Sequence, residues 1–282
     1  MTDQPSARVD EILKDARAKV DAADAEWLLA FVLGKSRSWL YARSDDTIPG
    51  DAVQRYHALL ERRIAGEPLA YLTGRKGFWR FELKVTPDTL VPRPETELLV
   101  ELLLARLSRE APVRVADLGT GSGAIALAIA YERPRAHVVA IDDSAKALEV
   151  AKSNAVALRL PNVEFRMGHW CEPLNDGPFD AIASNPPYIA LGDIHLEALR
   201  YEPASALASG RDGLDAIRDI VRTAPTHLVP GGALLIEHGR DQGPAVRALF
   251  EAAGFLDIDT GLDVEHRERV THGVMPGGAS LG

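Results

Sequence analysis

Phe179-Asp180-Ala181-Ile182-Ala183-Ser184-Asn185-Pro186-Pro187-Tyr188-Ile189 carries the two features that decide the fold of this chain. Its first half, 179–184, is a largely apolar run with the length and composition of a strand buried in a parallel sheet. Its second half begins at Asn185, and two prolines in a row cannot continue a sheet ladder. Because open α/β sheets bind ligands outside the carboxyl ends of their strands, the stretch predicts a ligand site at residues 185–188.

The motif Asn185-Pro186-Pro187-Tyr188 suits the recognition of a planar amine. Proline has no N–H group and a fixed φ, so the backbone carbonyls here stay unpaired and rigidly oriented. With the side-chain oxygen of Asn185 they can accept both hydrogens of one NH2 group, while Tyr188 supplies a flat face for the group that carries it. The nitrogen of such a group is a poor nucleophile because its lone pair is delocalised. Acceptors on both of its N–H bonds return electron density to the nitrogen and hold it in line with an electrophile. The motif predicts reaction at an amide or an aminated base; the plainer alternative is a turn.

A glycine-rich loop, Gly119-Thr120-Gly121-Ser122-Gly123, follows an earlier apolar run at 113–118 and opens a helix. Its glycines permit a tight turn and let a ligand approach the backbone closely. Asp142 ends the next apolar run, at 137–142. A carboxylate at that distance from the loop can accept hydrogen bonds from ribose hydroxyls, so the loop and Asp142 together predict a nucleoside cofactor.

The loop alone leaves two cofactors open. With Ala124 in third place it satisfies the dinucleotide fingerprint of nicotinamide enzymes. Asp117 before the loop and Gly123 within it favour S-adenosylmethionine (AdoMet) instead. The Asn-Pro-Pro-Tyr motif favours AdoMet more strongly, because the end of the fourth strand would face the reactive end of a cofactor bound at the first. Trp170, after the third strand, either lines an adenine pocket or packs in the core.

The second part of the chain alternates strands and helices. The predicted strands are 113–118, 137–142, 163–168, 179–184, 232–237, 256–262 and 268–274. The predicted helices between them are near 122–132, 144–158, 193–201, 214–228 and 242–253. This alternation is typical of a mostly parallel, doubly wound, Rossmann-like sheet, here of seven strands. Since no helix separates the last two strands, we expect them to pair antiparallel at one edge.

The amino-terminal part of the chain, 1–70, reads as a run of helices. Apolar residues recur at helical spacing over 9–13 and 25–32, and the second of these helices ends at Gly34. Ser36 can cap a short third helix, and Asp51 a fourth that ends near residue 66. Residues 74–91 alternate partly and carry aromatics, which predicts a β-hairpin, and a helix follows from about 94 to 108. We therefore expect a helical substrate-recognition domain at 1–73, a connector at 74–92 and a catalytic domain at 93–282.

Composition excludes several classes of protein. The chain has 282 residues, of which 46% are hydrophobic and 26% charged, as in ordinary globular proteins. Its formal net charge of −9 lies entirely in residues 91–282, which hold 18 basic and 27 acidic residues. An acidic catalytic part argues against direct binding of DNA. With one cysteine, no metal-spaced histidine pair, no membrane-length apolar run and no signal peptide, we expect a cytoplasmic enzyme without a metal. We also expect a monomer.

Other polar residues allow two interpretations each. Prolines on both sides hold Arg93 in a fixed loop, where it serves the site or forms an interdomain salt bridge. Glu237 and His238 end the fifth strand and have no evident partner in the sequence, so we take both as structural. A basic stretch forms either a solvated face or a docking surface for a partner close to RNA; it consists of Arg62, Arg63, Arg75, Lys76, Arg80 and Lys84.

These features together resemble the class I AdoMet-dependent methyltransferases, and more narrowly the peptide-chain release-factor glutamine methyltransferases of the PrmC/HemK family. The resemblance extends over essentially the whole chain, including the helical amino-terminal domain and the hairpin connector. The motifs that carry it are Pro-Arg-Pro-Glu-Thr-Glu at 92–97, Asp-Leu-Gly-Thr-Gly-Ser-Gly-Ala-Ile-Ala at 117–126, Ser-Asn-Pro-Pro-Tyr-Ile at 184–189, Ile-Glu-His-Gly at 236–239 and Glu-Arg-Val-Thr at 268–271.

The resemblance implies methyl transfer from AdoMet to the side-chain amide nitrogen of the glutamine in the Gly-Gly-Gln motif of peptide chain release factors. It implies that residues 119–123 and Asp142 hold AdoMet, that Trp170 contacts the adenine, and that Asn185 to Tyr188 hold the glutamine amide, with Asn185 next to the cofactor as well. His169 stands where family members often carry an acidic residue, which removes a carboxylate contact to adenine at that position.

Three alternatives remain open from the sequence. A glutamine methyltransferase acting on a ribosomal protein would use the same site. An adenine-amino methyltransferase acting on nucleic acid would share Asn-Pro-Pro-Tyr, but it needs a basic groove or a target-recognition domain, and the acidic catalytic part offers neither. An AdoMet-binding scaffold with a vestigial site would not need intact motifs.

Overall fold

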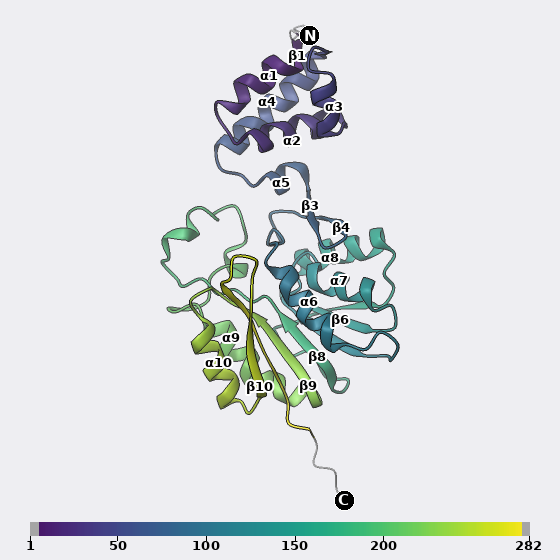
Figure 1. Cartoon of the computed structure of the whole chain (residues 1–282), viewed down its shortest axis with the longest axis vertical. Coiled ribbons are helices and arrows are strands. Elements are labelled where there is room, and N and C mark those ends of the chain that lie inside the picture. Colours follow the sequence, from purple (N-terminus) through teal and green to yellow (C-terminus); the bar gives the residue numbers. More distant parts are fainter. Residues whose placement is uncertain (1–5, 278–282) are drawn as a thin grey trace, which may run out of the picture. The chain divides into compact units, whose positions relative to one another are not determined.

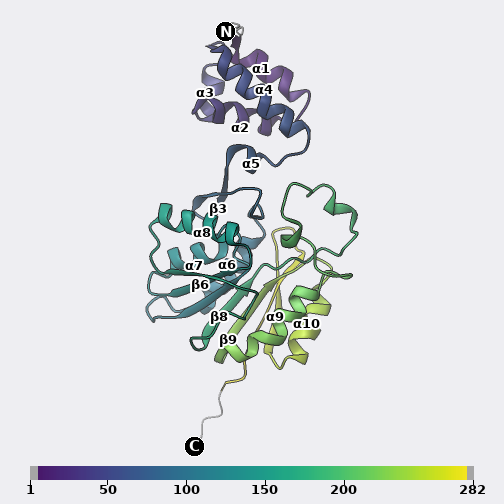
Figure 2. The same cartoon turned by 180° about the vertical axis from the view of Figure 1, so that it is seen from behind.

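The computed structural model describes residues 6–277 (Figures 1 and 2). These residues form two compact units, the first ending at Arg75 and the second beginning at Lys76. No helix in the described part of the chain is long and apolar enough to cross a membrane.

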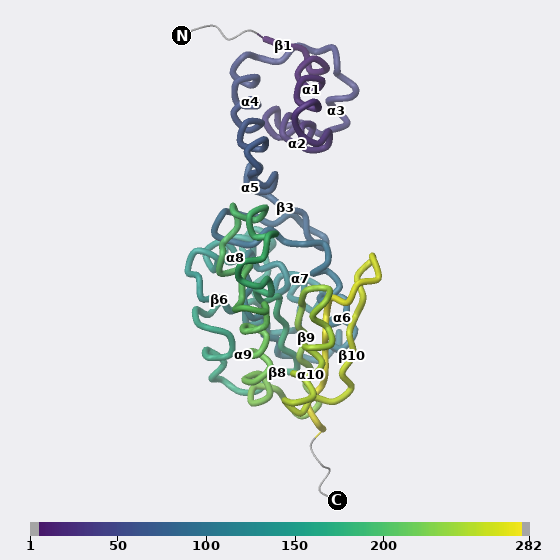
Figure 3. The backbone as a smooth tube through the Cα atoms, turned by 90° about the vertical axis from the view of Figure 1, so that its left-hand side faces the viewer, coloured from purple at the N-terminus to yellow at the C-terminus, as the bar shows by residue number. Residues whose placement is uncertain are grey.

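The first unit is a small helical bundle. Figure 3 shows the backbone of its helices, which bury one apolar cluster centred on Leu28, Leu29 and Tyr56. Two short antiparallel strands, β1 and β2, pair with each other in the same unit. The elements are β1 (Ala7–Arg8), α1 (Val9–Arg17), α2 (Ala22–Leu33), α3 (Arg37–Ala42), β2 (Thr47–Ile48), α4 (Gly50–Ile64) and α5 (Leu69–Thr73).

The helix caps in this unit follow from the sequence, with one exception. Gly34 takes a left-handed conformation (φ 64°) after α2. The Ser36 hydroxyl accepts a hydrogen bond from the Trp39 backbone N–H at 3.2 Å and so caps α3. The predicted cap at Asp51 is wrong. Helix α4 already begins at Gly50, after Pro49, so Asp51 lies in its first turn, where its charge still favours the helix dipole.

The second unit is built on a seven-stranded sheet with the order β10-β11-β9-β8-β5-β6-β7. Strands β5 to β9 are parallel, and the last two strands form the expected antiparallel pair at one edge. The strands are β5 (Arg114–Leu118), β6 (His137–Asp142), β7 (Val163–Met167), β8 (Phe179–Ser184), β9 (Leu228–Glu237), β10 (Leu256–Leu262) and β11 (Glu268–Val274).

Helices cover both faces of this sheet. Figure 1 shows α6, α7 and α8 on one side of the strands and α9 and α10 on the other. Alternate strand residues serve the two layers, because successive side chains in a strand point to opposite faces: Val115 faces α6 and α7, whereas Ala116 faces α9 and α10. The helices are α6 (Thr96–Arg106), α7 (Ala124–Glu132), α8 (Ala145–Leu158), α9 (Asp215–Thr223) and α10 (Gly243–Ala252).

A hairpin precedes the sheet, as predicted. Strands β3 (Arg75–Phe78) and β4 (Phe81–Lys84) pair with each other, and Phe78 and Leu83 are buried in the core of the second unit. The Trp79 backbone N–H donates to Glu97 at 2.8 Å, which fixes the hairpin on α6. The buried side chains and this hydrogen bond seat the hairpin on the second unit.

The predicted helix at 193–201 is wrong. Only a 3-10 turn, Ile194–Leu196, forms there, because Ile194 is 85% exposed and the segment has no apolar face to bury. The crossover from β8 to β9 is made by α9 alone, followed by a 3-10 turn, Ala224–His227, that contains Pro225. Residues 185–214 are therefore a long loop with two 3-10 turns, the second at Ala204–Ala206.

Candidate active site

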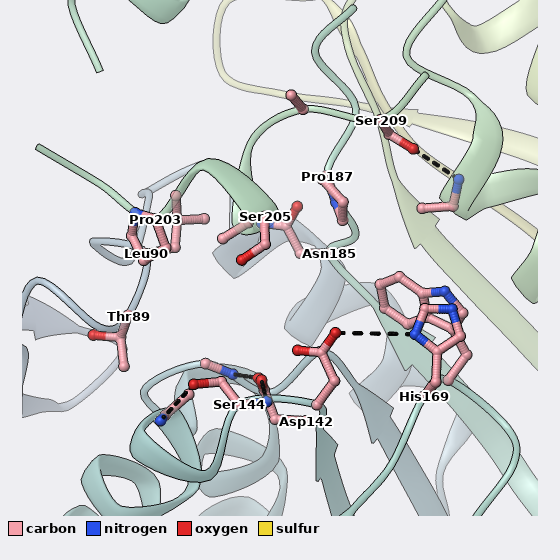
Figure 4. A pocket seen from close by; sticks show the side chains of 18 of the residues that line it. Thr89, Leu90, Asp142, Ser144, His169, Asn185, Pro187, Pro203, Ser205 and Ser209 are labelled. Atoms are coloured by element: carbon pink, nitrogen blue, oxygen red, sulfur yellow. Dashed lines mark hydrogen bonds and ion pairs between the residues drawn. The ribbon is translucent and has the colours of Figure 1, made fainter. Parts of the chain in front are cut away.

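A cavity of about 680 Å³ lies at the carboxyl ends of the parallel strands. Figure 4 shows Asn185 and Ser205 across the cavity from Asp142 and Ser144, with His169 at one end and Thr89 and Leu90 at the other. The residues following β5, β6 and β8 meet here because Leu118 pairs in register with both Ile141 and Ser184. The cavity has the size of a pocket for a small-molecule cofactor.

The glycine-rich loop forms one wall. The backbone N–H groups of Gly119 and Thr120 both donate to the Ile141 carbonyl, at 2.9 and 2.8 Å, which fixes the loop against β6. Gly119 has a φ of 73°, and a Cβ added to it would lie 3.2 Å from the Trp170 ring. Any other residue there would be strained in its backbone and would press on Trp170, so the wall requires glycine.

Asp142 is held in place by backbone donors. Its Oδ2 accepts from the Gly121 N–H at 2.8 Å and its Oδ1 from the Ser144 N–H at 2.9 Å. Burial raises the pKa of Asp142, and these two N–H groups oppose the rise. The carboxylate therefore presents its remaining lone pairs to the cavity in a fixed orientation.

Asp117 lies behind the loop and is fully buried. Its Oδ2 accepts from the Thr120 hydroxyl at 2.7 Å and from the Ala126 N–H at 3.1 Å, whereas its Oδ1 has no partner among residues 6–277. Burial raises its pKa to about 7 against the effect of those donors. Asp117 thus ties the loop to α7 and keeps one unpaired acceptor behind it.

Trp170 and His169 close one end of the cavity. Trp170 lines the cavity and also packs on the core beside α9, and its contact with adenine stays a prediction. Its φ of 44° is unusual for a bulky residue and turns the chain sharply after β7. The His169 ring lies 5.1 Å from the Trp170 ring and 3.6 Å, Nε2 to Oδ2, from Asp219, so a carboxylate from α9 stands beside this histidine.

Asn185 and Pro187 of the Asn-Pro-Pro-Tyr motif line the opposite wall. No donor among residues 6–277 is hydrogen-bonded to the backbone carbonyls of Asn185, Pro186 or Pro187, whereas the Tyr188 carbonyl accepts from Gln242 at 3.0 Å. The Asn185 Nδ2 donates to the Thr96 hydroxyl at 3.1 Å. The motif therefore offers free acceptors in a fixed frame.

The structure brings together part of the predicted set. Gly119, Gly121, Asp142, Trp170, Asn185 and Pro187 line the cavity. Thr120 and Ser122 line a recess of about 50 Å³ beside it, together with Asn185 and Thr96. Gly123, Pro186 and Tyr188 line neither: Gly123 packs on Leu127, Pro186 is buried, and Tyr188 packs on the core beside α9.

Two further segments line the cavity that the sequence does not single out. Residues 87–90 follow the hairpin, and Pro203, Ser205, Ala206, Ala208 and Ser209 come from the long loop after β8. Neither segment has a motif or a periodic pattern. Only their position in the chain could have identified the residues of the long loop, because a long loop that follows the motif strand of an open sheet lies beside the ligand site.

Arg93 joins these two segments. Its guanidinium pairs with Glu202, whose other oxygen accepts from the Val91 N–H at 2.9 Å. The Glu202 side chain is 2% exposed. The interpretation of Arg93 as half of an interdomain salt bridge is therefore wrong, because Arg93 and Glu202 both belong to the second unit.

The charge of the cavity is one-sided. Among residues 6–277, five aspartates line it and no lysine or arginine does; they are Asp88, Asp142, Asp143, Asp215 and Asp219. Acidic walls favour a ligand with positive charge. The close-fitting glycine loop, the fixed Asp142 carboxylate and this charge fit AdoMet, a nucleoside with a sulfonium centre, better than the anionic pyrophosphate of a dinucleotide.

Comparisons with known proteins agree with this fit. Residues 7–74 match the family described as "PrmC N-terminal domain", and residues 95–201 match "Methyltransferase small domain". A methyltransferase structure from Pyrococcus furiosus superposes with a TM-score of 0.52 at 17% identity over 77% of this chain and 97% of that one. The 16S rRNA N2 G1207 methyltransferase of Thermus thermophilus, solved with AdoMet and guanosine, gives 0.52 at 24% over 71% of this chain and 49% of that one. At such identities these structures establish the fold.

Fold and site define an AdoMet-dependent methyltransferase. Curated relatives narrow the class. The release factor glutamine methyltransferase of Xylella fastidiosa (strain Temecula1) is 52% identical over 94% of this chain and 98% of the relative, and that of Escherichia coli is 43% identical over 93% and 96%. The chain belongs to the release factor glutamine methyltransferase family.

Proposed function

We propose that this enzyme methylates the side-chain amide nitrogen of the glutamine in the Gly-Gly-Gln motif of peptide chain release factors. The observation that carries the proposal is the pair of free acceptors at Asn185 and Pro187, which line the cavity at the carboxyl end of β8. A primary amide is planar and has two N–H donors, which match a side-chain oxygen and a rigid backbone carbonyl. The names of the curated relatives supply the substrate protein.

The cofactor residues act as a rigid cradle. AdoMet, when bound, supplies an electrophilic methyl group on a sulfonium. We assign its binding to Gly119, Gly121, Asp142 and Trp170, which line the cavity, with Thr120 and Ser122 supporting the loop from the adjoining recess and Gly123 capping α7. Because the loop is fixed on Ile141 and Asp142 is fixed on the loop, little reorganisation is needed when the cofactor enters.

The substrate residues orient a weak nucleophile. Asn185 Oδ1 and a proline carbonyl accept the two N–H bonds of the amide, which keeps its nitrogen facing the cofactor side of the cavity. Pro186 is buried and Tyr188 packs on the core, so we assign both to fixing this frame. No strong general base is required, because the amide proton leaves after the methyl group has transferred.

We further propose that the first unit recognises the release factor. The described residues that line the cavity all lie between 87 and 219, so the first unit supplies none of them. The basic stretch contributes less free charge than its sequence suggests, because Arg62 pairs with Glu67, Arg63 with Asp24 and Arg80 with Glu132. A monomeric state remains a prediction.

Mass spectrometry of a purified bacterial release factor, incubated with the enzyme and AdoMet, tests the proposal. We expect a gain of one methyl group on the glutamine of Gly-Gly-Gln, and no gain with a substrate in which that glutamine is replaced by alanine. AdoMet binding measured separately, with no methylation of the release factor, would contradict the proposal. Ribosomal proteins and RNA incubated under the same conditions would then identify the alternative substrate.

A further inference from the structure

The side-chain amide of Asn185 works as an acceptor only in one of its two orientations. Its carbonyl oxygen and its NH2 group are nearly equal in shape, so a half-turn of the amide would aim donors at the substrate amide. Two NH2 groups facing each other cannot form the hydrogen bond that the proposed function needs. Something in the protein must therefore select the orientation, and the Asn185 Nδ2 bond to Thr96 at 3.1 Å is the contact that does so.

Thr96 has a proton to donate in turn. It is the first residue of α6 and is 3% exposed, and its hydroxyl does not cap the helix. Because Thr96 Oγ1 accepts from Asn185, its own hydroxyl hydrogen must point elsewhere. The neighbouring acceptor is Glu237, the last residue of β9, and the Thr96 hydroxyl is one of the groups that favour the charged form of its carboxyl.

The buried carboxyl of Glu237 is costly to the folded state. It is fully buried, and neither Oε1 nor Oε2 has a partner of standard hydrogen-bond geometry within residues 6–277. The groups that face it are Thr96 on α6, Glu95 just before α6, Tyr188 after β8 and Arg269 on β11. A purely structural role would be better served by an apolar residue, because an unpaired buried carboxyl is strongly destabilising.

We propose that Thr96 and Glu237 are positioning residues, which form a chain Glu237–Thr96–Asn185 that aims the Asn185 carbonyl oxygen at the substrate amide. In this chain the Thr96 hydroxyl hydrogen turns toward Glu237, whose two buried oxygens have no other partner within residues 6–277, and the Thr96 oxygen remains the acceptor for Asn185 Nδ2. The inference rests on the proposed function, in which Asn185 Oδ1 is an acceptor for the substrate.

Side-chain amide NMR of the full-length protein tests the orientation without substrate. The two Nδ2 protons of Asn185 are assigned by comparison with Asn185→Ala. We expect them to exchange slowly in the wild type and in Thr96→Ser, which keeps the hydroxyl, and at least about tenfold faster in Thr96→Val, which keeps the shape. Glu237→Leu should resemble Thr96→Val, and Glu237→Gln, which retains an acceptor oxygen, should resemble the wild type. Unchanged exchange in Thr96→Val would overturn the proposal.

Kinetics provide the second readout. Misorientation of the acceptor should lower kcat of Thr96→Val about 10²-fold, while Thr96→Ser recovers most of the loss and AdoMet affinity stays within about threefold. In an Asn185→Ala background, Thr96→Val should cause no further loss of kcat, because the side chain that Thr96 orients is absent. Additive losses, or an equal loss in Thr96→Ser, would contradict a positioning role. Thr226→Val, which removes a hydroxyl bonded only to a backbone carbonyl, is the control.

The two proposals fail in different ways. A wild-type enzyme that does not methylate a release factor overturns the proposed function, and the NMR comparison then still decides the orientation of Asn185. A wild-type enzyme that does methylate it, with Asn185 protons indifferent to Thr96, overturns the positioning chain alone. If Thr96→Val does not fold, Thr96→Ala removes the same hydroxyl without adding a methyl group in the helix.

Discussion

Several polar groups at and around this site have no hydrogen-bond partner in the protein. Within residues 6–277, Asn185, Pro186 and Pro187 present carbonyls with no protein donor, and Asp117 and Glu237 retain buried oxygens without partners. Buried polar groups are normally paired, so this concentration marks a functional site. Asn185 and Pro187 line the cavity and can offer their carbonyls to a ligand, whereas Asp117 and Glu237 do not line it.

The first prediction concerns Asn185. Replacement by alanine removes one of two acceptors for the substrate amide, and we expect kcat to fall about 10²- to 10³-fold with AdoMet affinity largely retained, as for the loss of one catalytic hydrogen bond elsewhere. Methylation kinetics with a release factor, together with calorimetric titration of AdoMet, measure the two effects. Asn175→Ala, an exposed asparagine in a loop, is the control. Equal losses of turnover and AdoMet affinity would point to a cofactor role instead.

The second prediction concerns the ionisation of Glu237. Burial raises its pKa to about 7, from an ordinary value of 4.5, so the folded protein holds this proton between about pH 4.5 and 7 whereas the unfolded chain releases it. The folded state binds more protons in that range, and the free energy of unfolding must therefore fall as the pH rises through it. The full effect of this one group, reached above about pH 7, is about 3 kcal/mol.

Glu237→Gln isolates this effect. We expect the variant and the wild type to have similar free energies of unfolding near pH 4.5, and the variant to become more stable by up to about 3 kcal/mol at pH 8. Asp117, whose pKa is also raised to about 7, and His238, whose pKa is lowered by burial, titrate in both proteins and cancel in the difference. Urea unfolding at several pH values measures it, and a difference independent of pH would be inconsistent with a proton held by Glu237.

At this scale the sequence predicted the residues with a local signature. Asn-Pro-Pro-Tyr and the glycine loop have fixed spacing along the chain, and Asp142 ends a strand at a distance typical of the fold. Thr96 and Glu237 have no such signature, because their partners are far away in sequence, as the long separation of Thr96 from Asn185 shows. Glu237 was therefore interpreted as structural, and its buried, unpaired state became visible only in three dimensions.

At the scale of elements, the site depends on a clasp between two irregular segments. Val91 and Arg93, which precede α6, are both bound by the buried carboxylate of Glu202, in the long loop after β8. Each segment also lines the cavity nearby, through residues 87–90 and 203–209. Neither segment has a long helix or strand of its own, and the clasp ties the two walls directly to each other.

The third prediction tests this clasp. Arg93→Ala leaves Glu202 buried without its charge partner, and we expect it to lower the free energy of unfolding by about 3 kcal/mol. It should also weaken AdoMet binding severalfold, because residues 87–90 line the cavity from the same segment. Arg109→Ala, at an exposed arginine, is the matched control. If Arg93→Ala were as stable as the wild type in urea, Glu202 would be hydrogen-bonded to water instead, and the stabilising role of the clasp would be contradicted.

Element prediction failed where the apolar pattern is interrupted or absent. The apolar runs were sufficient to predict the strands, because buried strands need apolar side chains. Strand β9 begins at Leu228, earlier than predicted, because glycines at 231 and 232 interrupt its apolar run and conceal the first residues from the sequence pattern. Residues 193–201 were expected to be helical. Their conformation is instead determined by contacts at the ends of the loop, such as the bond from the Ile189 N–H to the Leu207 carbonyl at 2.9 Å.

At the scale of the whole molecule, cofactor chemistry and charge are concentrated in one unit. Among the described residues, the lining of the cavity comes entirely from the second unit, and the net charge of −9 belongs to residues 91–282, whereas residues 1–90 are neutral. The first unit buries its own apolar cluster and has α-helices with well-formed caps at Asp21 and Ser36. A unit that folds around its own core and supplies nothing to the cavity agrees with the recognition role proposed above.

The last prediction follows from this division of labour. A chain that begins at Gly74 keeps the hairpin and every described residue of the cavity, so we expect AdoMet affinity within about threefold of the full-length value. Loss of a docking surface worth about 3 kcal/mol should lower kcat/KM for an intact release factor about 10²-fold. A short peptide containing Gly-Gly-Gln reaches only the cavity, and both chains should methylate it at similar rates. If the shortened chain lost activity on peptide and protein alike, the first unit would have to support the catalytic site itself, and recognition would not be its role.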